Sequence, residues 1–86
     1  MNSLIYLIKG HLDHDAYMLD ELAEWVKEAL SGGDSLAQNF QMELRAALDQ
    51  QGMVTPALYK RWTGENLEDQ ESVQERLQEI WDACFG

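Results

Sequence analysis

The feature that most constrains the fold is the helical spacing of apolar residues along most of the chain. Between residues 16 and 30, apolar side chains recur at steps of three and four, so they share one face of an α-helix, with acidic residues opposite. These apolar positions are Leu19, Leu22, Ala23, Val26, Ala29 and Leu30. The same periodicity returns in residues 36–51 and toward the C-terminus. The sequence therefore predicts an all-α fold.

Glycines and capping residues separate the first two long periodic segments. Gly32 and Gly33 end the segment that begins at residue 16. Asp34 or Ser35 can then cap the helix expected over residues 36–51, because both side chains carry an oxygen that accepts from free backbone N–H groups. We therefore expect a short loop between two helices here.

Similar signals delimit two helices in the C-terminal half. Thr55 and Pro56 combine a capping hydroxyl with a proline at the first helical position, which predicts the start of a short helix. Gly64 ends that helix. Asn66 or Asp69 then opens the last helix, which we expect to run to about residue 83.

The N-terminal segment is apolar and short. Its leucine and isoleucine residues at positions 4, 5, 8 and 12 have helical spacing, and Ser3 can cap the start. A strand also suits this composition, but no second strand is expected to pair with it, so we predict a helix. The apolar run is too short for a membrane span and follows no basic leader, so we expect a cytoplasmic protein without a signal peptide.

The number of helices and the chain length together indicate an architecture. A chain of 86 residues is long enough for one hydrophobic core and too short for two. Helices joined by short loops pack side by side, so we expect residues 1–86 to form a single helical domain, a compact bundle of four to five short helices. Cys84 is the one cysteine, so an internal disulfide is excluded.

The chain is strongly acidic, with a net charge of −10 from 16 acidic and six basic residues. Such a charge repels nucleic acid and anionic membranes, so neither is expected as a direct partner. Residues 1–34 hold seven acids and two lysines, and residues 64–86 hold seven acids and one arginine, whereas residues 35–63 are nearly neutral. A partner attracted by charge is therefore expected to be a protein with a basic surface.

An acidic row is expected along the last helix. Its members recur at steps of three and four and are Glu68, Glu71, Glu75, Glu79 and Asp82. Spread over roughly 21 Å of helix, they give one charge per about 4–5 Å, against one per about 3.4 Å along a DNA strand. With Asp20, Glu24 and Glu28 beside it, the row would imitate a phosphate backbone and occupy a basic groove. A solvated face without a partner explains the same pattern.

Aromatic and sulfur-containing side chains suggest a second mode of binding. Trp25 falls at the edge of the apolar face of its helix, and Tyr17 and Met18 precede that face. Exposed aromatic residues mark binding hot spots, either for another protein or for a second copy of the chain in a homodimer. We therefore expect a small non-enzymatic protein that binds a larger protein partner and regulates or inhibits it.

The run from Gly32 through Gly33, Asp34 and Ser35 to Leu36 resembles the attachment motif of acyl and peptidyl carrier proteins. In that family the serine after Gly-Asp takes a phosphopantetheine arm at the start of a long helix, so the resemblance implies that Ser35 is modified. Carriers are also short, acidic and four-helical. Where carriers keep apolar residues after the serine, this chain has Asn39, Gln41 and Arg45. The carrier interpretation is therefore the alternative to partner binding.

Two further groups of residues have patterns that could carry chemistry. His11, Asp13, His14 and Asp15 are potential metal ligands, but a zinc site needs three or four converging ligands, so a polar connector is the expected role. Cys84 lies on an apolar helix face, where a thiol is usually inert. No metal, cofactor or enzymatic activity is therefore expected.

The segment from Tyr59 to Trp62 combines aromatic and basic residues, as single-stranded nucleic-acid sites do. With so acidic a chain, this interpretation is disfavoured. Trp62 lies four residues after Leu58, so we expect it in the core. Lys60 and Arg61 are expected to face the acidic helices of the chain itself.

Overall fold

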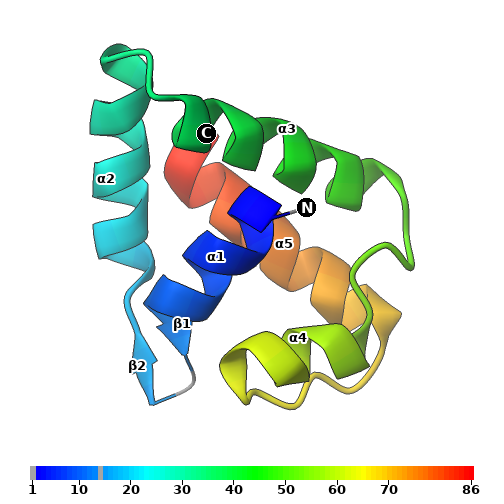
Figure 1. The fold of residues 1–86 in the computed structure, drawn as a ribbon. Coiled ribbons are helices and arrows are strands. Elements are labelled where there is room, and N and C mark those ends of the chain that lie inside the picture. Colours follow the sequence, from blue (N-terminus) through cyan, green and yellow to red (C-terminus); the bar gives the residue numbers. More distant parts are fainter. Residues whose placement is uncertain (1, 14) are drawn as a thin grey trace.

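The computed structural model, which describes residues 2–13 and 15–86, has five helices in that part of the chain, packed around a common hydrophobic core (Figure 1). The helices are α1 (Asn2–His11), α2 (Leu19–Ser31), α3 (Ser35–Asp49), α4 (Pro56–Thr63) and α5 (Gln70–Phe85). In the view of Figure 1, α1 crosses in front of α5, α2 lies along the left, α3 runs across the top and α4 lies below. The predicted all-α bundle is confirmed.

The core takes side chains from every helix, which explains why the periodic positions point inward. Its largest fully buried members are Tyr59, Phe40, Leu4, Ile8, Leu12, Leu22, Leu44, Leu77, Ile80, Val26, Val54 and Val73. Each buried aliphatic or aromatic side chain contributes about 1.5–3 kcal/mol relative to an exposed one. The most extensive helix contacts join α2 to α5 and α1 to α3. Helix α5 also packs against α3, so it contacts both of the segments with the clearest helical periodicity, α2 and α3.

The segment between α1 and α2 differs from the prediction of a helix that starts at residue 16. A short strand β1 (Leu12–Asp13) pairs antiparallel with β2 (Ala16–Tyr17), and Leu12 lies opposite Tyr17. The cause is local, because an Asp13 carboxylate oxygen accepts from the backbone N–H of Asp15 at 2.9 Å and closes a tight turn. Helix α2 therefore begins only at Leu19.

The ends of α4 and the start of α5 follow the expected signals, whereas the start of α1 does not. Thr55 Oγ1 accepts from the backbone N–H of Leu58 at 3.1 Å and so caps α4, and Gly64 ends that helix with φ +83°. Asp69, rather than Asn66, caps α5. Ser3 is buried within α1 instead of capping it. No helix in residues 2–13 and 15–86 is long and apolar enough to cross a membrane.

The loop between α2 and α3 is held by a side-chain cap. Asp34 Oδ1 accepts from the backbone N–H groups of Leu36 at 2.8 Å and Ala37 at 3.1 Å. These donors have no carbonyl partner at a helix start, so the carboxylate satisfies them. Gly33 has φ +76°, a conformation that suits glycine. The expected loop and the expected cap are therefore both present.

We predict that Asp34→Ala lowers the free energy of unfolding by about 1 kcal/mol, because two amide donors lose their acceptor. Asp34→Asn keeps a side-chain oxygen at the same place and should stay close to the unsubstituted protein. Urea denaturation followed by circular dichroism measures both. Equal losses in the two variants would show that the carboxylate acts by charge instead of by capping.

Candidate functional site

The acidic row on α5 is present but is shorter than the sequence predicted. Glu71, Glu75 and Asp82 are exposed and follow the helical spacing of the side opposite the buried Val73 and Leu77. The inclusion of Glu68 in the row was wrong. Because the Asp69 carboxylate accepts from the backbone N–H of Ser72 and starts the helix, Glu68 lies in the preceding loop.

A second acidic row lies on α2, the helix that packs most extensively against α5. Asp20, Glu24 and Glu28 are all exposed, as expected. Lys27 is also exposed and follows Glu24 by one helical turn, so it moderates the charge of this row. The two rows belong to neighbouring helices that come from opposite ends of the chain.

Most of these carboxylates have no basic side chain next to them. Within residues 2–13 and 15–86, no lysine or arginine nitrogen lies within 4.0 Å of the carboxylates of Asp20, Glu21, Glu24, Glu28, Glu68, Glu71, Glu75 or Asp82. Lys60 and Arg61, which were expected to face the acidic helices, are exposed on α4 and form no ion pair with a described acid. The negative charge of the two rows is therefore not balanced by local ion pairs.

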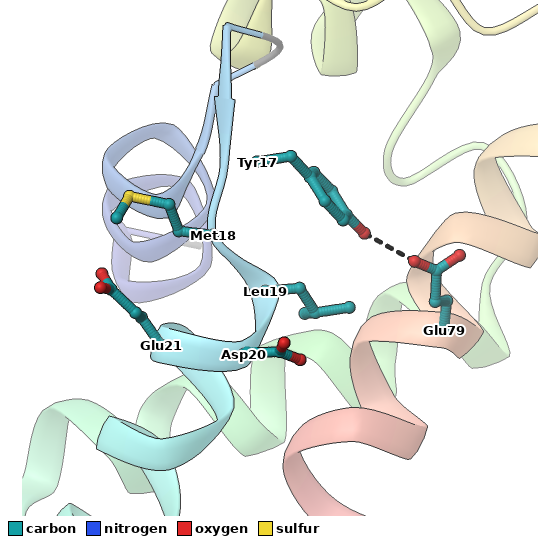
Figure 2. Close-up of a pocket in the computed structure, with 6 residues that line it drawn as sticks. All are labelled: Tyr17, Met18, Leu19, Asp20, Glu21 and Glu79. Carbon is teal, nitrogen blue, oxygen red and sulfur yellow. Dashed lines mark hydrogen bonds between the residues drawn. The ribbon is translucent and has the colours of Figure 1, made fainter.

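One carboxylate of each predicted row, Asp20 of α2 and Glu79 of α5, lines an open cleft of about 470 Å³ between the start of α2 and the middle of α5 (Figure 2). Its lining residues are Tyr17, Met18, Leu19, Asp20, Glu21 and Glu79. Tyr17 donates its hydroxyl to Glu79 Oε1 at 2.7 Å, and in Figure 2 its ring extends across the cleft toward α5. The cleft thus combines an aromatic ring, apolar side chains and carboxylates from two helices.

The half-buried side chain of Arg76 lies next to the Tyr17 ring and connects α5 to β2, α4 and the loop between α4 and α5. Arg76 of α5 donates two hydrogen bonds to the carboxylate of Glu65, at 2.6 and 2.8 Å, and a third to the Tyr59 hydroxyl at 3.2 Å. Its guanidinium carbon lies 5.0 Å from the centre of the Tyr17 ring. Arg76 Nε is 4.0 Å from Glu79 Oε2, which is too far for a hydrogen bond.

These contacts shift the pKa values of the residues around Arg76. The hydrogen bonds to Glu65 raise the pKa of Arg76, which stays fully charged. Burial raises the pKa of Tyr17, and the hydrogen bond to Glu79 raises it further. Burial also raises the pKa of Tyr59. Both tyrosines therefore remain neutral at physiological pH, with Tyr17 donating to Glu79 and Tyr59 accepting from Arg76.

The candidate hydrophobic anchors differ in exposure. Trp25 is half-buried and packs against the core, whereas Tyr17 and Met18 are each 40% exposed. Among the described residues, the two most exposed large apolar side chains are those of Tyr6, at 64%, and Met42, at 66%. Neither was singled out from the sequence. Their exposure could have been predicted, because both positions lie on the side of the helix opposite the apolar positions of α1 and α3. Only Tyr17 and Met18, of these residues, line the cleft.

The residues considered for other chemistry lie apart from the cleft. No group of three or more possible metal ligands occurs within residues 2–13 and 15–86, and His14 lies outside the described residues. His11 Nδ1 is 3.0 Å from the Leu7 carbonyl oxygen. Ser35 is exposed as the first residue of α3. Since the neighbouring Asp34 carboxylate caps that helix, a structural role already accounts for the motif, and modification of Ser35 stays a prediction.

No known family, characterised protein or solved structure gives a significant match to this chain. The case for a function therefore rests on the geometry of the chain's own residues. The geometry singles out the cleft and the two acidic rows, each of which contributes one carboxylate to it.

We predict that Arg76→Gln lowers the free energy of unfolding by about 1–3 kcal/mol, because the half-buried Glu65 carboxylate loses two charged hydrogen bonds. Arg45→Gln is the matched control. Arg45 pairs with Asp49 at 3.3 Å on an exposed surface and lies over the Trp81 ring, so its loss should cost less than about 1 kcal/mol. Urea denaturation of the two variants gives the comparison, and equal effects would contradict a central role for Arg76.

Cys84 is buried, and burial raises the pKa of its thiol to about 11, with Lys27 acting weakly in the opposite direction. The reactive thiolate is therefore scarce at neutral pH. We predict that a thiol reagent at pH 8 modifies the native protein at least about tenfold more slowly than the protein unfolded in urea. The reagent releases a chromophore when it reacts with the thiol, and the absorbance of that chromophore measures both rates. Comparable rates in the native and the unfolded protein would show that the C-terminal turn of α5 opens readily.

Proposed function

We propose that this chain is a small acidic protein without enzymatic activity that binds a larger protein through a basic surface of that partner and thereby regulates or inhibits it. The observation that supports the proposal is that neighbouring helices α2 and α5 each carry an acidic row, and that among the described residues no lysine or arginine nitrogen lies within 4.0 Å of any row carboxylate except Glu79. An unbalanced field of this sign attracts a basic surface and speeds encounter with it.

The spacing of the rows favours a specific form of this function. Glu71, Glu75 and Asp82 repeat along α5 at helical steps, with Glu79 turned toward α2. With Glu79 included, the row spans roughly 16 Å with about 5–6 Å between successive charges, against about 3.4 Å between phosphates along a nucleic-acid strand. A partner whose groove normally holds nucleic acid is therefore the target that we favour, with occupation of the groove as the means of inhibition.

Affinity capture with quantitative follow-up tests the proposal. The immobilised protein is exposed to extract of its native cells, and retained proteins are eluted with increasing salt and titrated individually. We predict that a basic protein is retained and that its affinity falls steeply with salt. Glu71→Gln with Glu75→Gln should weaken this binding by about tenfold or more.

The matched control removes the same charge elsewhere. Asp34→Asn with Asp49→Asn leaves both acidic rows intact and keeps the cap of α3, so it should change affinity by less than about threefold. If the two double variants bind alike, the α5 row is not the contact. If no basic protein is retained even at low salt, the proposed function is wrong.

A further inference from the structure

The cleft between β2 and α5 contains an aromatic ring that already stacks on one guanidinium. Arg76 lies over the Tyr17 ring at 5.0 Å and is held there by its hydrogen bonds to Glu65. Tyr17 nevertheless remains 40% exposed where it lines the cleft. Because an aromatic ring attracts cations on both faces, a ring that remains partly exposed can take a second cation.

Carboxylates from two helices stand at the same cleft. Glu79 accepts from the Tyr17 hydroxyl through Oε1, whereas Oε2 is 4.0 Å from Arg76 Nε. The Glu79 side chain is 54% exposed. Asp20 and Glu21 are exposed at the start of α2 and have no basic side chain nearby among the described residues. In Figure 2, Asp20 lies below the Tyr17 ring on the side of α5. A cation that enters the cleft would therefore meet acceptors from both helices.

The remaining walls are apolar. Leu19 extends beneath the ring of Tyr17, whereas the side chain of Met18, which is 40% exposed, points to the other side of the chain in Figure 2. These walls distinguish the cleft from the rest of the acidic rows, which offer carboxylates alone. They suit a ligand that carries its charge at the end of an aliphatic stem.

We infer that the cleft receives an arginine side chain of the partner protein, whose guanidinium stacks on Tyr17 and pairs with Asp20 and Glu79. The inference rests on the proposed function, since it specifies how the acidic surface selects its basic partner. A planar guanidinium can stack on the ring and donate in its own plane to both carboxylates, whereas the ammonium of lysine offers a compact charge without a face. Arginine is therefore the preferred occupant. Its binding in the cleft would fix the position of the partner on the acidic surface.

Hexa-arginine and hexa-lysine peptides, both acetylated and amidated, are suitable probes because their charges are equal. Titration of the isotope-labelled protein by nuclear magnetic resonance gives the site and the affinity of each peptide. We expect amide shifts to concentrate at residues 17–21 and at Glu79. We also expect hexa-arginine to bind about two- to fivefold more tightly than hexa-lysine.

Substitutions of Tyr17 separate the ring from its hydroxyl. Tyr17→Phe keeps the ring and should retain the preference for arginine, whereas Tyr17→Leu should abolish it. Thermal unfolding of each variant establishes that the fold is kept. Equal affinity for the two peptides in the unsubstituted protein, or an arginine preference that persists in Tyr17→Leu, would overturn the inference.

Two double variants with equal charge loss separate the cleft from the acidic rows. Asp20→Asn with Glu79→Gln alters the cleft, and the amide oxygen that Glu79→Gln introduces can still accept from the Tyr17 hydroxyl. Glu71→Gln with Glu75→Gln alters the α5 row only. The inference requires the cleft variant to weaken hexa-arginine binding more than the row variant does. Equal weakening would remove the cleft inference but leave the acidic surface, and hence the proposed function, standing.

Discussion

The position of Arg76 determines how the charge of this protein is distributed. It is the single basic residue of α5, and its guanidinium faces the interior, where it donates two hydrogen bonds to Glu65 and one to Tyr59. The side chain is only 20% exposed. Because its charge is held by Glu65, it cannot neutralise Glu71, Glu75 and Asp82 on the outer side. The same contact that joins the α4–α5 loop to the bundle therefore leaves the acidic row of α5 unbalanced.

Much of the bundle was predictable because its signals are local. Helical spacing identified the buried face of α2, and the pairing of Thr55 with Pro56 identified the start of α4 to the residue. The exposure of Glu71, Glu75 and Asp82 followed from the same periodicity. Glu68 was misplaced because the spacing of three and four residues continues beyond the helix in the sequence, and only the capping contact of Asp69 shows where the helix begins.

The cleft was not predictable from the sequence, because it depends on contacts between distant segments. Tyr17 and Glu79 are 62 positions apart, and their hydrogen bond exists only because the β1–β2 turn delays the start of α2. A helix that began at residue 16 would have given Tyr17 a different direction. Arg76 gave a partial signal, since it lies three residues after Val73 at the flank of the apolar face. Nothing local indicated that two tyrosines would flank it.

The acidic rows are difficult to explain by solubility alone. Glu71 and Glu75, like Glu24 and Glu28, are like charges one helical turn apart, and each such pair destabilises its helix by a few tenths of a kcal/mol. Lysines interspersed among these positions would keep the surface solvated and remove the repulsion. Among the described residues, Lys27 is the one lysine within these rows, and no lysine or arginine nitrogen lies within 4.0 Å of a row carboxylate except that of Arg76 near Glu79. A contact with an external basic surface would relieve this repulsion. The carboxylates that destabilise the free protein would then stabilise a complex with a basic partner.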